Sequence, residues 1–231
     1  MGRSSDDLKR LAAEKAALFL DGVRVLGLGT GSTAAHFVEV VGEMVRSGAL
    51  TDIVAIPTSR ATEQQARDLG IPLGDLDDHP QVDVTVDGAD EVSRELDLIK
   101  GLGGALTREK IVAAASRELI IIVEESKLVA RLGERAPLPV EVIPFGWKTV
   151  QARLRELGGT PVLRRHGDAP MTTDQGNYLL DCRFGAGIAD AAGISAAVDA
   201  IPGVVAHGLF LGMADRVVVA GEGGVRILER A

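Results

Sequence analysis

The first 130 residues alternate short apolar runs with segments whose apolar side chains recur at helical spacing. Runs and helical segments follow one another at residues 23–28, 33–47, 53–56, 60–69, 82–86, 108–116 and 119–123. This alternation predicts β-α-β units, and therefore an α/β fold built on a doubly wound, mostly parallel, Rossmann-like sheet. A serine N-cap and first-turn acids at residues 4–7 predict one more helix ahead of the first run.

The pattern changes near residue 131. Strand patterns at residues 137–144, 161–165, 177–182 and 203–207 enclose helical patterns at residues 148–157 and 189–200. This β-α-β-β-α-β order predicts a small ferredoxin-like α+β domain. Two last strand patterns, at residues 215–220 and 224–228, are too short to fold alone and are expected to return to the first sheet. We therefore expect a Rossmann-like catalytic domain of residues 1–130 plus 208–231, and a small α+β domain of residues 131–207.

The first apolar run leads into a glycine-rich turn, Gly29-Thr30-Gly31-Ser32-Thr33, which precedes the first helical segment after it. Such a turn suits a phosphate, because glycines let the backbone approach an anion and a helix N-terminus offers unpaired N–H groups. The same letters fit the dinucleotide pattern G-x-G-x-x-G/A, so an NAD(P)-dependent dehydrogenase is an alternative. The acid expected about 20 residues later is missing from residues 53–60, although Arg60 is available to a 2′-phosphate.

One segment between the third and fourth apolar runs concentrates acids and cations around glycine turns, as an active site does. Asp87 and Asp90 follow a predicted strand in a tight polar turn, at the carboxyl end where open α/β sheets bind ligands. Lys100 opens a glycine run, and Glu109 falls in the first turn of a helix whose expected N-cap is Thr107. Taken singly, each residue is ordinary, since Asp-Gly turns are common and a first-turn glutamate complements the helix dipole.

Charge and composition exclude several classes of protein. The net charge of −8 and the lack of a run of basic residues argue against a nucleic-acid partner. An acidic protein that binds a phosphate must place cations at its site, which draws attention to Lys9, Lys100 and Lys127. The longest strongly apolar run, residues 119–123, is too short to span a bilayer, and the N-terminus lacks the layout of a secretory signal.

The cysteine and the histidines of the chain bear on its cellular location and on metal binding. Cys182 is the only cysteine, so no intrachain disulfide is possible and a cytoplasmic location is expected. The four histidines are scattered without the spacing of metal ligands, and we expect no metal site.

Six motifs follow one another almost end to end along the chain. They are GLGTGSTA, TSRATEQQARDLGIPL, VDGADE, LIKGLGGALTREK, APLPVEVIPFGW and IPGVVAHGLF. This ordered series resembles ribose-5-phosphate isomerase of the A type. The resemblance implies a two-domain homo-oligomer, a homodimer or a homotetramer, that interconverts ribose 5-phosphate and ribulose 5-phosphate in the pentose phosphate pathway. It implies neither a metal nor a nucleotide cofactor.

The resemblance also implies roles for single residues. Glu109 matches the base that carries a proton between C2 and C1, Lys100 the cation that offsets the oxyanion, and Asp87 and Asp90 the acids that handle hydroxyl protons. The implied substrate- and phosphate-binding residues are Thr30, Gly31, Ser32, Thr33, Gly88, Ala89, Gly101, Leu102, Gly103, Lys127 and Lys9. Leu102 stands where the family pattern often has glycine, so a positive φ there would strain the loop.

A sugar-phosphate sensor without catalysis is a further alternative. Such a sensor has no use for a base like Glu109, and a regulator would need a DNA-binding helix-turn-helix for which the chain has no spare length.

Overall fold

The computed structural model of the chain describes residues 2–230, which form two compact units. The first unit comprises the residues up to Ala89, Arg108–Lys127 and the residues from Met213 on. The second comprises Asp90–Thr107 and Leu128–Gly212. This division places residues 90–107, 128–130 and 208–212 in the second unit, whereas the expected boundaries gave them to the first domain. The reason is tertiary pairing, since short strands within 90–107 pair with residues 209–210.

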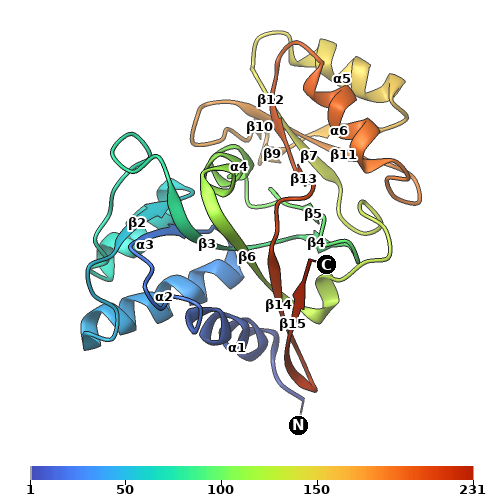
Figure 1. The fold of residues 1–231 in the computed structure, drawn as a ribbon. Helices are drawn as coiled ribbons and strands as arrows, with labels where there is room; N and C mark the ends of the chain where they lie inside the picture. Colours follow the sequence, from blue (N-terminus) through green and yellow to red (C-terminus); the bar gives the residue numbers. More distant parts are fainter. Residues whose placement is uncertain (1, 231) are drawn as a thin grey trace. The chain divides into compact units, whose positions relative to one another are not determined.

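A six-stranded sheet forms the centre of the first unit, in the order β15-β14-β6-β3-β1-β2 (Figure 1). Its strands are β1 Val25–Leu28, β2 Val54–Pro57, β3 Val82–Gly88, β6 Ser116–Glu124, β14 Arg216–Gly221 and β15 Gly224–Glu229. Neighbouring strands are parallel except β14 and β15, which form an antiparallel hairpin at one edge. The predicted α/β class and mostly parallel sheet are confirmed, including the return of the last two strands to this sheet.

Helices pack on both faces of this sheet. They are α1 Ser5–Ala17, α2 Ser32–Ser47, α3 Arg60–Asp68 and α4 Leu106–Ala114. Side chains of α1, α2 and α3, among them Phe37 and Ala66, share one buried cluster with Ala55 of β2. Val112 of α4 belongs to a separate cluster with Ile56, the next residue of β2. Because successive residues of a strand point to opposite faces, α4 covers the face opposite to α1–α3, and the sheet is doubly wound.

The strand order creates a switch point beside β1. The chain passes from β1 to β2 on one side and then returns to β3 on the other side of β1. The connections at the carboxyl ends of β1 and β3 therefore leave in opposite directions, which opens a crevice where α/β sheets bind ligands.

The second unit is built on a four-stranded antiparallel sheet in the order β12-β7-β11-β8. Its elements are β7 Leu138–Val142, α5 Trp147–Glu156, β8 Thr160–Leu163, β11 Tyr178–Arg183, α6 Ala191–Asp199 and β12 Val204–His207. Leu154 of α5 and Val198 of α6 are fully buried in one cluster with side chains of the sheet. The predicted ferredoxin-like order is confirmed.

The short elements were not predicted from the sequence. They are β4 Glu91–Val92, β5 Leu98–Ile99 and β13 Leu209–Phe210, which form a three-stranded sheet, the hairpin β9 Arg165–His166 and β10 Ala169–Pro170, and the 3₁₀ turn η1 Glu125–Lys127. Strands of two residues have no periodicity to detect, because a period of two needs several repeats. No helix in residues 2–230 combines the length and the apolar character needed to cross a bilayer.

Candidate active site

The glycine turn after β1 leads directly into α2, as the sequence predicts. Gly31 is the N-cap of α2, with φ 110°, and it makes no side-chain capping bond. The first turn of α2 carries no acid. The first N–H groups of a helix have no acceptor within the helix and lie at the positive end of its dipole. Gly31, Ser32 and Thr33 therefore surround a helix terminus that is suited to a phosphate.

Asp87, the second-last residue of β3, lies beside this turn and fixes it. Its carboxylate is 1% exposed, and Oδ1 accepts the N–H of Thr30 at 3.0 Å and that of Gly88 at 2.7 Å. The approach requires glycine at position 29, since a Cβ there would lie 2.5 Å from the Cα of Asp87. Gly88 and Ala89 continue from Asp87 and are half-buried. Two separate motifs, the turn and VDGADE, are thus brought together in the first unit.

Glu109 lies in the first turn of α4 and is 4% exposed. A solvated first-turn acid would be expected if it only complemented the dipole. Glu63, the first-turn acid of α3, is of that ordinary kind, because it is partly exposed and pairs with Arg67 at 2.7 Å. The N-cap prediction for Thr107 is wrong: α4 begins at Leu106, and the Thr107 hydroxyl donates to Glu141 at 2.6 Å instead.

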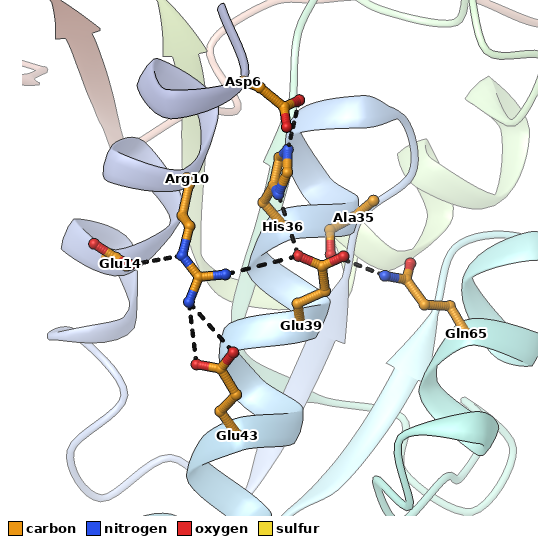
Figure 2. Close-up of polar contacts among 8 residues, drawn as sticks. All are labelled: Asp6, Arg10, Glu14, Ala35, His36, Glu39, Glu43 and Gln65. Atoms are coloured by element: carbon orange, nitrogen blue, oxygen red, sulfur yellow. Dashed lines mark hydrogen bonds and ion pairs between the residues drawn. The ribbon is translucent and has the colours of Figure 1, made fainter. Parts of the chain in front are cut away.

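The first unit carries two of the expected phosphate-binding lysines, Lys127 and Lys9, on two different elements. Lys127 ends η1, directly after β6, the neighbour of β3, and is half-buried. Lys9 lies on α1, which polar contacts fasten to α2 (Figure 2). Arg10 of α1 reaches Glu43 of α2 at 3.2 Å, and His36 of α2 reaches back to α1. Each exposed pair contributes little alone, but together they keep the helix that carries Lys9 in register with α2.

The remaining expected site residues belong to the second unit. Asp90 accepts the N–H of Leu102 at 2.9 Å through Oδ2. This bond joins the start of the segment Asp90–Thr107 to the glycine run. Lys100 is buried, and its backbone N–H donates to the carbonyl of Gly208 at 2.9 Å. The Lys100 ammonium lies 5.5 Å from the centre of the Phe210 ring, within the range of a cation–π contact.

The glycine run avoids the strain expected at Leu102. Positive φ angles fall on Gly101, at 106°, and on Gly104, at 85°, and not on Leu102. The side chain of Leu102 is exposed and Gly103 follows it in the turn. Glycine thus occurs where the backbone needs it, and the leucine occupies an ordinary conformation.

Arg164 is a residue that the sequence did not reveal. Its Nη1 donates to the carbonyls of Gly101 and Leu102, at 3.1 and 2.9 Å, while its other nitrogens form a bidentate pair with Asp181. The contact joins residues more than 60 positions apart in the chain, and no local pattern predicts such a pair.

The described residues were also compared with the layout of a metal-binding site and with that of a dinucleotide-binding site. Residues 2–230 contain no group of three His, Cys, Asp or Glu side chains placed to hold an ion. The end of β2 also lacks a dinucleotide acid, since Thr58 and Ser59 follow it and turn their hydroxyls toward Thr30.

Comparison with known proteins agrees with this geometry. Residues 54–224 match the family model of ribose 5-phosphate isomerase A (phosphoriboisomerase A). The chain belongs to this family. It is 52% identical to ribose-5-phosphate isomerase A of Roseiflexus castenholzii, over 96% of this chain and 94% of that one. The enzyme of the same name from Gloeobacter violaceus is 56% identical, over 96% of each chain.

A solved structure of D-ribose-5-phosphate isomerase in complex with phospho-erythronic acid extends the match to the fold. It has 40% identical residues, covers 99% of this chain and 100% of its own, and superposes with a TM-score of 0.96. Family membership supports neither the dehydrogenase that the glycine turn had left open nor the non-catalytic sensor.

Proposed function

We propose that this chain interconverts D-ribose 5-phosphate and D-ribulose 5-phosphate through an enediolate. The observation that carries the proposal is the presence, in the first unit, of a helix N-terminus without a side-chain cap, at Gly31, and of a buried carboxylic acid in a helix's first turn, Glu109. The first feature suits the phosphate of the sugar, and the second suits a proton transfer that water would otherwise disturb.

The reaction moves one proton between neighbouring carbons. Glu109 removes the proton from C2 of the aldose, and the electron pair passes into an enediolate that extends over C1 and C2. Returning the same proton to C1 gives the ketose, so one carboxylate serves first as base and then as acid. Lys100 offsets the negative charge on the enediolate oxygens. Asp87, with Asp90 as second candidate, carries the hydroxyl protons that change place, including those moved when the furanose ring opens.

Substrate binding is assigned to separate residues. Gly31, Ser32 and Thr33 donate to the phosphate, with Lys127 and, more distantly, Lys9 supplying positive charge. Gly88 and Ala89, with Gly101, Leu102 and Gly103, line the sugar through their backbone. The relative's ligand supports a sugar-phosphate substrate, because phospho-erythronic acid carries a carboxylate and a phosphate, the charge pattern that an enediolate phosphate also has.

The decisive test is the formation of ribulose 5-phosphate from ribose 5-phosphate by the purified chain. In D₂O the product should carry deuterium at the carbon that receives the proton. Glu109→Gln should keep the fold and lose about 10²–10⁴-fold in kcat. Glu63→Gln is the matched control, since it alters the first-turn acid of α3 and should leave turnover unchanged. Turnover and exchange in Glu109→Gln at nearly the wild-type rate would assign the base to another residue.

Metal independence is tested in the same assay. Activity should survive exhaustive treatment with EDTA and need no added nucleotide. Loss of turnover that a divalent ion restores would contradict this part of the proposal.

We expect a homodimer or homotetramer in the cytoplasm. This expectation rests on the family resemblance, which implies a homo-oligomer. Sedimentation equilibrium should give a mass of two or four chains, and a monomer at micromolar concentration would contradict the expectation.

A further inference from the structure

Helix α3 presents a row of polar side chains to the glycine turn of the first unit. Ser59, its N-cap, Thr62 and Gln65 follow one another at a spacing of three, which places them on one face of the helix. Gln65 donates to the carbonyl of Ala35 in the first turns of α2 at 2.9 Å, as Figure 2 shows. Ser59 and Thr62 are buried and reach the turn that precedes α2.

Four hydroxyl groups form one cluster beneath this turn. Thr30 Oγ1 lies 2.7 Å from Thr58 Oγ1, 2.9 Å from Ser59 Oγ and 3.1 Å from Thr62 Oγ1. Ser59 and Thr62 are also bonded to each other at 3.0 Å. Thr58 is fully buried, so the cluster is closed to water on its inner side.

The cluster uses all its hydrogen atoms internally. Thr58 donates to the carbonyl of Leu28 and Thr62 to that of Gly29, each at 2.9 Å. Ser59 donates to Thr62, and the single hydrogen of the Thr30 hydroxyl goes to Ser59 or to Thr58. A hydroxyl has one hydrogen, so Thr30 has none to offer outward unless it gives up its bond within the cluster. Its backbone N–H is likewise engaged, by Asp87 at 3.0 Å.

The same contacts hold the backbone on both sides of Thr30. The carbonyl of Leu28 accepts from both the N–H and the hydroxyl of Thr58, and the N–H of Gly29 donates to Val86. Every polar backbone group from the Leu28 carbonyl to the Thr30 N–H therefore points inward. The next N–H groups along the chain, those of Gly31, Ser32 and Thr33, belong to the N-terminus of α2, where the first N–H groups have no acceptor within the helix.

We propose that Thr58, Ser59 and Thr62 are positioning residues, which hold the anion-binding turn in shape through Thr30 without touching the substrate. The inference rests on the proposed binding of a sugar phosphate at this turn. It also reassigns Thr30, which the motif alone marked as a phosphate ligand, to the inner support.

The test is Thr62→Val, which keeps the shape of the side chain and removes the bonds to Gly29, Ser59 and Thr30. We expect KM for ribose 5-phosphate and the inhibition constant of inorganic phosphate each to rise about tenfold, while kcat changes by less than about twofold. Thr62→Ser restores the hydroxyl and should restore both constants. Ser116→Ala is the matched control, because it removes a part-buried hydroxyl pair, Thr85–Ser116 at 2.6 Å, at the amino end of β6. A general loss of stability would affect both variants alike.

Ser32→Ala separates this inference from the proposed function. If Ser32→Ala weakens phosphate inhibition but folded Thr62→Val binds phosphate as wild type does, the turn binds the anion and the positioning role is refuted. If neither variant alters phosphate inhibition, the anion site itself is misplaced. Should Thr62→Val fail to fold, Thr58→Val takes its place, and a folded Thr58→Val with unchanged KM and phosphate inhibition likewise refutes the role.

Discussion

Strand β3 carries two aspartates, four residues apart, that hold the two ends of the neighbouring strand β1. Asp83 accepts the N–H groups of Arg24 and Val25, each at 3.0 Å, where β1 begins. Asp87 accepts the N–H of Thr30 at 3.0 Å, just after β1 ends. The bonding is the same at both ends, yet only the second aspartate lies among groups suited to chemistry.

The surroundings account for the difference. In β-α-β units each helix begins near the carboxyl end of a strand. Asp87 lies at the carboxyl ends of the strands, where the helix dipoles present their positive ends. Asp83 lies at the opposite edge, 3.6 Å from Arg117, and its side chain is 30% exposed. The N–H of Val25, together with Arg24 and the charge of Arg117, holds the pKa of Asp83 below its usual value. A low pKa keeps a carboxylate charged and structural, whereas a proton carrier must exchange its proton.

Between the two aspartates, the larger expected effect is that of Asp87→Asn. The amide oxygen can still accept the N–H of Thr30, so the fold should survive, but the residue can no longer take up a proton. We expect kcat to fall by about 10²-fold or more, with thermal stability close to wild type. Asp83→Asn should leave kcat and KM unchanged. Steady-state kinetics of both variants decides the matter, and equal activity losses would erase the distinction between the two edges.

Two cations allow the same comparison between the carboxyl and amino ends of the strands. Lys127 follows β6 at the carboxyl edge, and Arg117 lies near the start of the same strand. Lys127→Ala should raise KM for ribose 5-phosphate about tenfold, because a charge-assisted bond to phosphate contributes roughly 1.5–3 kcal/mol. Arg117→Ala should leave KM unchanged. An unaltered KM and kcat/KM in Lys127→Ala would remove that lysine from the site.

Substitution of Asp83, at the amino ends of the strands, should lower thermal stability, whereas substitution of Asp87, at the carboxyl ends, should lower kcat. Because the folded pKa of Asp83 is lowered, its charged form stabilises the fold above the unfolded pKa of about 3.9, and this contribution is lost as pH falls through the folded value. Asp83→Asn should therefore lower Tm by about 2–4 °C at pH 7. The difference from wild type should shrink as the pH is lowered below about 4. A gap in Tm that is the same at pH 3 and pH 7 would contradict the assignment.

The smallest effect concerns Cys182, in the core of the second unit. Burial raises the pKa of its thiol to about 12, so it should not react with iodoacetamide in the native protein at pH 8. Denaturant should expose it to complete labelling. Asp83→Asn should leave native labelling negligible, since the altered bonds lie in the first unit. Mass spectrometry after timed labelling provides the measurement, and rapid native labelling would show that the core opens readily.

Much of the fold could be predicted because its signals are local. The β-α-β alternation depends on periods of two and 3.6 residues, and the Ser4 cap of α1 is completed by Asp7, three residues on. The first-turn position of Glu109 and the helix after the glycine turn follow from the same short-range rules. The expected N-cap at Thr107 failed because its hydroxyl found a distant acceptor, Glu141, instead of the helix end.

The sequence by itself determined the class of fold, the family and the list of candidate residues, since ordered motifs and local periodicity carry that information. Only the tertiary structure decided what each side chain faces. It turned Thr30 toward Thr58, Ser59 and Thr62, and it brought Arg164 to the glycine run across 63 positions of the chain. Residue type sets what chemistry a side chain can do, but its role depends on partners that are far apart along the chain until the sheets form.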